Sequence, residues 1–300
     1  MKALVTGGCG FIGSHVVDLL VSKGVDVRVI DNLSSEVHDQ FYFNDAAEYH
    51  HKDICDYDKV EKVMDGIDYV FHLAAQSRIQ PAIANPLSAV KVNAMGTMNI
   101  LEAARQAGVK RVMFSSTSSA YGHTKKSPLV ETMRSNCLNP YSVSKRAGEE
   151  LCRIYYEVYG LETIAFRYFN VYGNREPLRG VYAPVVGRFL KMRKNNEPLT
   201  IVGDGLQRRD FTHVADVVEA NWLASQTDSK EALGQFFNVG SGENYSVMEL
   251  AEMVGGEYVH IPDRIGEARE TLSDSTKIKS VLGWKSTVNF QQYIKKEVGL

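Results

Sequence analysis

The glycine-rich segment TGGCGFIG, at residues 6–13, constrains the fold more than any other stretch of the chain. Its glycines match the spacing G-x-G-x-x-G at Gly8, Gly10 and Gly13, and the spacing G-x-x-G-x-x-G when counted from Gly7. The apolar run KALVT before it reads as a buried strand, and a helical pattern follows it. A pyrophosphate binds at a helix N-terminus only where bare backbone lets N–H groups approach it. The loop therefore predicts a dinucleotide site, whereas the same glycines in another setting would predict only a turn.

Strand and helix patterns alternate through the first half of the chain. The β-rich runs are VDVRVI, YVFHLA and RVMFSS. A long helical pattern at 88–107 separates the last two, and another at 139–160 follows them. This spacing predicts an α/β fold with a doubly wound, Rossmann-like parallel sheet. We expect a nucleotide-binding domain at 1–170 and a smaller, interleaved C-terminal substrate domain at 171–300. Helix and strand patterns near 210–240 predict that this segment rejoins the first domain.

The second predicted strand ends at Asp31, near the spacing at which an acidic side chain accepts hydrogen bonds from an adenosine ribose. A carboxylate at that place repels the 2′-phosphate of NADP, so NAD is the expected cofactor. The alternative is an aspartate that only stabilises the turn leading into Asn32. The glycine loop upstream favours the ribose role.

The segment YSVSK places Tyr141 and Lys145 four residues apart, on one face of a predicted helix. Free tyrosine has a pKa of about 10 and is a poor base near neutrality. A nearby ammonium group and the positive end of the helix both favour its phenolate form. By itself the spacing Tyr-x-x-x-Lys is common by chance, and it would then describe an ordinary exposed helix.

A run of hydroxyl residues supplies a third element. The strand RVMFSS leads into STSSAYG (116–122), which puts Thr117 at the carboxyl end of a sheet strand. Ligands bind at that edge in doubly wound folds. Thr117 could therefore hydrogen-bond the sugar hydroxyl whose proton Tyr141 removes, although such runs are more often polar loops.

Together with FHLAA (71–75) and RYFNVYG (167–173), these motifs occur in an order that resembles the extended short-chain dehydrogenases. Within that family the chain is most similar to the UDP-sugar 4-epimerases. The resemblance implies a tightly held NAD, a UDP-sugar substrate, and a homodimer formed by pairing the helices Ser88–Ala107 and Tyr141–Tyr159. The residues expected at the cofactor are Gly7, Gly10, Phe11, Ile12, Gly13, Asp31, Asn32, Asp53, Ile54, Leu73, Ala74, Ala75, Asn93, Tyr141 and Lys145.

The residues after the threonine bear on the type of reaction. Related sugar 4,6-dehydratases carry an Asp-Glu pair there, which eliminates water, whereas this chain has Ser118 and Ser119. Dehydration is therefore disfavoured, and oxidation at C4 followed by return of the hydride to the opposite face remains. The resemblance makes Thr117, Tyr141 and Lys145 the catalytic residues.

The resemblance also assigns the residues that hold the substrate. Asn170, Arg209 and Arg264 match diphosphate-binding positions, and arginine can bind pyrophosphate oxygens in a bidentate way. Thr117 and Ser118 would face the sugar. Thr271 matches a wall position where glucose-restricted enzymes carry tyrosine, so we expect UDP-N-acetylglucosamine to be accepted as well as UDP-glucose.

Three alternatives to a UDP-glucose-type 4-epimerase stay open. Uronic-acid epimerases also carry a threonine followed by serines, which could hold a carboxylate, although Asn170 counts against that variant. A net oxidoreductase or decarboxylase would release NADH or carbon dioxide. A non-catalytic NAD sensor commonly loses the tyrosine or the lysine, and this chain keeps both.

Bulk properties restrict the partners and the location. The net charge of −2 gives no general reason to bind nucleic acid or an anionic membrane. No apolar run approaches the roughly 20 residues that span a bilayer, and no secretory signal is visible. The 4 cysteines are scattered without the paired spacing of a metal site. We therefore expect a cytoplasmic protein that holds no metal.

Overall fold

The computed structural model describes residues 1–124, 126–180 and 182–299. A central sheet of 7 strands has the order β11-β6-β5-β4-β1-β2-β3, and every pairing in it is parallel. The predicted α/β class is thus confirmed. The strands are β1 (Lys2–Thr6), β2 (Asp26–Asp31), β3 (Glu48–His51), β4 (Tyr69–His72), β5 (Arg111–Thr117), β6 (Glu162–Tyr168) and β11 (Gln235–Val239). The chain runs outward from β1 in one direction and then from β4 in the other, so the strand order reverses between β1 and β4.

Helices cover both faces of this sheet and bury two separate apolar cores. One core packs under α1 (Phe11–Ser22), α8 (Val214–Gln226) and α10 (Thr276–Leu282). The other packs under α2 (Tyr57–Glu61), α5 (Thr97–Gln106) and α6 (Pro140–Tyr159). Because helices cover both faces of the sheet, a central strand such as β5 is buried at every residue, and its polar side chains lie at its two ends.

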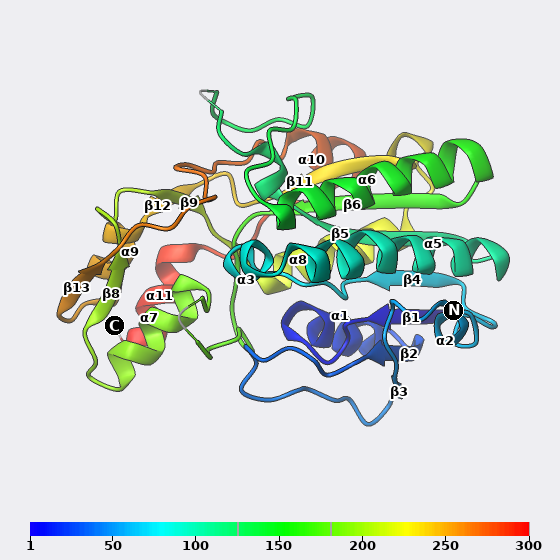
Figure 1. Ribbon diagram of the computed structural model, residues 1–300, viewed down its shortest axis with the longest axis horizontal. Coiled ribbons are helices and arrows are strands. Elements are labelled where there is room, and N and C mark those ends of the chain that lie inside the picture. Colours follow the sequence, from blue (N-terminus) through cyan, green and yellow to red (C-terminus); the bar gives the residue numbers. More distant parts are fainter. Residues whose placement is uncertain (125, 181, 300) are drawn as a thin grey trace.

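The C-terminal part has its own, smaller core, on the left in Figure 1. Short strands pair there as β10–β7, β12–β9 and β13–β8. Around them lie α7 (Val185–Lys194), α9 (Val247–Val254) and α11 (Phe290–Val298). The strands are β7 (Val171–Tyr172), β8 (Leu199–Val202), β9 (Arg208–Asp210), β10 (Thr212–His213), β12 (Asn244–Ser246) and β13 (Tyr258–Ile261).

The chain crosses between the two parts more than once. The position expected for the boundary, residue 170, lies between β6 and β7. Within 210–240, α8 packs against α1, and β11 pairs with β6 at the edge of the central sheet. More of the C-terminal half packs on the central sheet than the segment 210–240, because α10 and the buried Trp284 also belong to its core. The Trp284 indole donates a hydrogen bond to the carbonyl of Asp216 at 2.8 Å.

The helix expected over 88–107 differs in detail. Its backbone is helical throughout, but it divides into α4 (Pro86–Val90), a π-helical segment (Lys91–Gly96) and α5. The short helix α3 (Ile79–Ala84) precedes it. The π-helical segment holds the buried Asn93, whose side chain bonds to groups outside the helix, and π-helical turns commonly accompany such departures from regular packing.

Candidate active site

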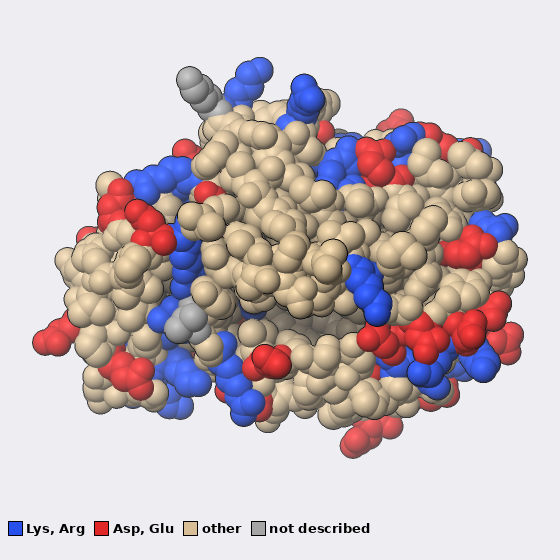
Figure 2. Space-filling view, in the orientation of Figure 1, with Lys and Arg blue, Asp and Glu red and all other residues tan. Residues whose placement is uncertain are grey.

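A cleft of about 490 Å³ opens where the carboxyl ends of the central strands face the C-terminal part. In Figure 2 the surface is hollowed near the middle of the view, and Lys and Arg side chains gather beside the left end of the hollow. Both parts of the chain line this cleft. The predicted site residues that line it are Gly7, Gly10, Phe11, Ile12, Gly13, Asp31, Asn32, Ile54, Leu73, Ala74, Ala75, Thr117, Ser118, Tyr141, Lys145, Asn170, Arg209, Arg264 and Thr271.

The glycine loop leaves no room for side chains. Gly7 has φ +70, and a Cβ on it would lie 2.8 Å from the Cα of Ala74. A Cβ on Gly13 would lie 2.1 Å from the carbonyl oxygen of Gly7. Gly10 precedes α1 without a side-chain cap, so the first amides of the helix are presented to the cleft as backbone donors. The loop therefore fits the pyrophosphate of a dinucleotide.

Asp31 lies at the end of β2 and is held by backbone donors. One carboxylate oxygen accepts a hydrogen bond from the Cys9 N–H at 3.0 Å, and the other accepts from the Leu33 N–H at 2.9 Å. Each oxygen can accept more than one hydrogen bond, so the group can stabilise the turn and still bind ribose hydroxyls. The two roles considered from the sequence are compatible.

Two residues expected at the cofactor do not line the cleft. Asp53 accepts a hydrogen bond from the side chain of Asn32, which does line the cleft, at 3.2 Å. Asn93 is buried, and its amide bonds with the backbone of Gln76 in both directions and with the Ser144 hydroxyl. Asn93 thus ties the loop after β4 to α6, and its polar atoms serve the protein itself.

The residues predicted to carry the chemistry meet in the cleft. Thr117 is the last residue of β5, and Tyr141 lies in the first turn of α6, one turn before Lys145. The side chains of Thr117 and Tyr141 share a hydrogen bond. A capping box formed by Asn139 and Ser142 fixes the start of α6, with the Asn139 side chain accepting from the Ser142 N–H at 2.8 Å.

Burial dominates the electrostatics of this group. It raises the pKa of the Tyr141 phenol, while the hydrogen bond with Thr117 and the positive charge of Arg78 act in the opposite direction. Burial also lowers the pKa of Lys145 to about 7, and its ammonium lies 4.4 Å from the centre of the Phe114 ring. The sequence suggested that Lys145 would favour the phenolate, but the cation that lowers the pKa of the phenol in this structure is Arg78.

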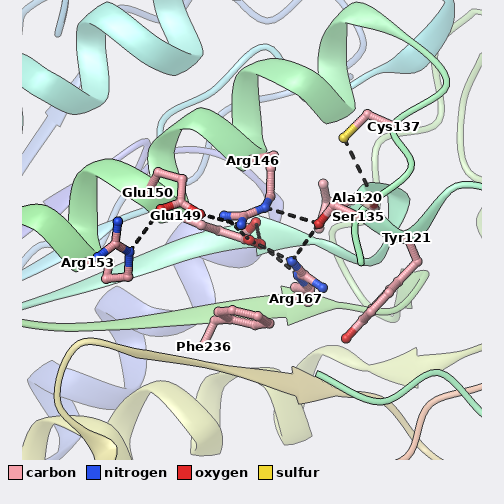
Figure 3. A network of polar contacts seen from close by, with 12 residues as sticks. Ala120, Tyr121, Ser135, Cys137, Arg146, Glu149, Glu150, Arg153, Arg167 and Phe236 are labelled. Carbon is pink, nitrogen blue, oxygen red and sulfur yellow. Dashed lines mark hydrogen bonds and ion pairs between the residues drawn. The ribbon is translucent and has the colours of Figure 1, made fainter. Parts of the chain in front are cut away.

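A buried ion pair behind the reactive face fixes α6 against the sheet (Figure 3). The Arg167 guanidinium, on β6, donates to both carboxylate oxygens of Glu149, each at 2.8 Å. Glu149 lies two turns beyond Tyr141 and accepts a further hydrogen bond from the Ser116 hydroxyl at 2.5 Å. Because Ser116 directly precedes Thr117, this pair sets the position of the strand end relative to the helix.

Arginine side chains gather at the C-terminal end of the cleft. Arg209 donates to two backbone carbonyls and pairs with Glu267 at 3.5 Å, and Arg264 lies over the Tyr182 ring at 5.3 Å. Arg188 of α7 also lines the cleft, and burial together with the charge of Arg264 lowers its pKa. Like charges held this close favour an anionic ligand.

Asn170 and Thr271 form one wall of the same region. The Asn170 side chain donates to the Asp210 carbonyl at 2.9 Å and to the Thr271 hydroxyl at 3.2 Å. Thr271 is buried, and its hydroxyl also accepts from the Asp210 N–H at 3.3 Å. A small residue therefore occupies a position where a larger one would extend into the cleft.

Sequence reasoning missed Arg78, Glu176 and Arg188. Val185, Arg188 and Phe189 of α7 all line the cleft. Arg188 and Phe189 follow Val185 by three and four residues, which is the spacing of one helix face. Recognising α7 would therefore have indicated it. Among the described residues there is no cluster of His, Cys, Asp and Glu that could hold a metal ion. The described helices are all too short or too polar to cross a membrane.

Known proteins resemble the chain over nearly its whole length. A family model described as GDP-mannose 4,6 dehydratase matches residues 4–297. A putative UDP-glucose 4-epimerase of Methanocaldococcus jannaschii is 38% identical over 304 residues, covering 98% of this chain and 96% of the relative. The crystal structure of a UDP-glucose 4-epimerase with UDP-glucose from Thermotoga maritima superposes with a TM-score of 0.93 at 37% identity, covering 100% of this chain and 98% of that one.

A third relative differs in its substrate. The UDP-glucuronic acid 4-epimerase from Bacillus cereus, in complex with UDP-glucuronic acid and NAD, superposes with a TM-score of 0.89 at 29% identity, covering 100% of this chain and 98% of that one. Because the family match and the relatives span almost all of the sequence, the protein is an NAD-dependent enzyme of the extended short-chain dehydrogenase family, in the group that the GDP-mannose 4,6 dehydratase model describes and to which UDP-glucose 4-epimerases belong.

Proposed function

We propose that this enzyme inverts the configuration at C4 of a UDP-hexose through a 4-keto intermediate, with no net oxidation. The observation that carries the proposal is one cleft that joins three features: the glycine loop, the hydrogen-bonded pair Thr117 and Tyr141, and the arginines at the far end. The serines Ser118 and Ser119 line the cleft next to Thr117 and cannot act as the acid and base of a dehydratase.

The protein's own residues handle the proton. Tyr141 would remove it from the 4-hydroxyl and later return it. Thr117, which lines the cleft beside the phenol, would hydrogen-bond the same 4-hydroxyl and orient it. Bound NAD supplies the reversible two-electron acceptor for C4. Lys145, one turn along α6, presents its amine to the same part of the cleft and orients the groups bound there.

The nucleotide end must be held more firmly than the sugar, because the keto sugar has to present its opposite face before reduction. Arg209, Arg264 and Arg188 would bind the diphosphate oxygens, and Asn170 would align them. Thr271 leaves room beside the sugar, so we expect UDP-N-acetylglucosamine to be a substrate as well as UDP-glucose. A net oxidoreductase or decarboxylase acting on a UDP-sugar is the alternative function.

The deciding experiment is a screen of UDP-glucose, UDP-N-acetylglucosamine and UDP-glucuronate for C4 inversion by the purified enzyme without added cofactor. An epimerase retains its NAD and forms the C4 epimer with no change in absorbance at the wavelength of NADH. Stoichiometric release of NADH or of carbon dioxide would instead identify a net oxidoreductase or a decarboxylase.

We also propose that two copies of the chain pair through α4, α5 and α6. Two adjoining helical stretches carry exposed apolar side chains: Leu87, Val90, Met95 and Met98 on the first, and Val143, Ile154, Val158 and Tyr159 on the second. An apolar face of this extent usually marks an interface. Analytical ultracentrifugation should give about twice the 33.5 kDa chain mass, and Val158→Glu should reduce it to the mass of one chain.

A further inference from the structure

Arg78 brings a positive charge to the reacting end of the cleft. It lies in the loop between β4 and α3, lines the cleft, and acts electrostatically on Tyr141. Its Nε atom is buried and has no hydrogen-bond partner within the described chain. A buried guanidinium nitrogen without an acceptor is costly, so a ligand that supplies an oxygen atom there is favoured.

Glu176 faces Arg78 from the C-terminal part but does not neutralise it. One carboxyl oxygen accepts a hydrogen bond from the Gly187 N–H at 3.0 Å, near the start of α7, and the other is buried without a partner among the described residues. Burial raises the pKa of Glu176 to about 8, although the charge of Arg78 acts in the opposite direction. At neutral pH the carboxyl group is therefore mostly protonated, and the charge of Arg78 remains available to an anion.

The groups around this charge suit a carboxylate rather than a neutral sugar. The acidic side chains that line the described cleft are engaged elsewhere: Asp31 at the end of β2, and Glu267 in its pair with Arg209. Hydroxyl donors lie on the Tyr141 side, where Ser118 and Ser119 follow Thr117. A guanidinium beside several hydroxyls binds a carboxylate through short, charge-assisted hydrogen bonds.

We propose that Arg78 is a specificity residue that binds a carboxylate on C6 of the sugar, so that UDP-hexuronates are substrates of this cleft. The inference rests on the proposed function, because it takes Tyr141 to act at C4, and the charge of Arg78 acts on Tyr141. The C6 substituent is carried by C5, the ring atom next to C4. The inference concerns a different part of the sugar from Thr271, which faces the C2 substituent. Acceptance of a uronate and acceptance of an N-acetyl group are therefore independent.

The test measures binding apart from turnover. Calorimetric titrations with UDP-glucuronate and with UDP-glucose are made on Tyr141→Phe and on Tyr141→Phe combined with Arg78→Met. Loss of charge-assisted hydrogen bonds should weaken the binding affinity for UDP-glucuronate by roughly 10- to 100-fold. The affinity for UDP-glucose should fall by less than about 3-fold. Arg78→Lys keeps the charge without the fork of donors and should give an intermediate loss. Arg179→Met is the matched control, because it removes an arginine whose side chain is 60% exposed and pairs with Asp39.

Three outcomes would overturn the assignment. An equal loss of affinity for both ligands would mean that Arg78 supports the fold or the position of Tyr141 and does not bind the carboxylate. Loss of bound NAD, measured after denaturing extraction, would mean that Arg78 serves the cofactor pyrophosphate. Failure of the unaltered cleft to bind UDP-glucuronate would exclude the substrate class. If selectivity depends on Arg78 but no UDP-sugar is inverted at C4, the assignment stands and the proposed function fails.

Discussion

Lys145 should destabilise the folded protein at neutral pH, and replacing it with methionine should relieve that cost. Its side chain is only 3% exposed, and burial lowers its pKa from the ordinary value of 10.5 to about 7. Methionine has a similar length and carries no charge, and its thioether can contact the Phe114 ring, over which the Lys145 ammonium now lies. The variant loses a residue proposed for the active site, so gain of stability and loss of activity should appear together.

The size of the effect follows from proton linkage. The unfolded chain binds the proton of Lys145 more tightly than the folded protein does, so stability rises with pH between about 7 and 10.5. Each pH unit in that window contributes about 1.4 kcal/mol, which makes the cost of the charged amine about 5 kcal/mol at pH 7 and below. The cost disappears above pH 10.5, where the amine is neutral in both states.

Urea unfolding of the two NAD-free proteins at pH 7, 8 and 9 provides the assay. The variant should be the more stable protein at pH 7, and its advantage should shrink by about 1.4 kcal/mol for each pH unit. Packing differences between lysine and methionine change the size of the gap but not its slope with pH. Parallel stability curves for the two proteins would refute the reasoning, because they would mean that the buried amine titrates as it does in water.

Three further predictions concern function. Tyr141→Phe removes the acid/base hydroxyl and keeps the ring, so turnover should fall by roughly 10²-fold or more while NAD content stays the same, and near-normal turnover would contradict the mechanism. Asp31→Ala should weaken NAD binding and narrow the gap to NADP, whereas finding NADP in the purified wild-type protein would show that the carboxylate does not select the cofactor. Thr271→Tyr should abolish turnover of UDP-N-acetylglucosamine and spare UDP-glucose, since a phenol at this buried position must project into the cleft. Equal loss on both sugars would remove Thr271 as the cause of selectivity.

Local sequence signals predicted the central sheet and many residues of the candidate site that line the cleft. The glycine loop and the cap at Asn139 are each encoded within a few neighbouring residues, so they can be read without knowledge of the tertiary fold. The helix that starts at Pro140 is confirmed, as is the parallel sheet. Tyr141 and Lys145 follow from the same helix, because a spacing of four residues fixes a shared face.

Features that depend on contacts between distant segments were not predictable in this way. Arg78 and Glu176 are almost one hundred residues apart, and only the tertiary fold brings their side chains near each other. Asn93 matched a cofactor position by resemblance, yet its amide is committed to Gln76 and Ser144. Its inward position also accompanies the π-helical segment, which no periodicity in the sequence indicates.

The repeated crossing of the chain between its two parts has a consequence for how such an enzyme can diverge. The C-terminal part consists of two excursions, from β6 to α8 and from β11 to α10, and of the terminal helix α11, so both ends of each of the two excursions are anchored in the sheet part. Insertions or substitutions within an excursion can reshape the C-terminal end of the cleft without displacing Tyr141 or the glycine loop. The same connectivity means that no single break in the chain separates the two parts. Neither part could therefore be exchanged between proteins as one continuous segment.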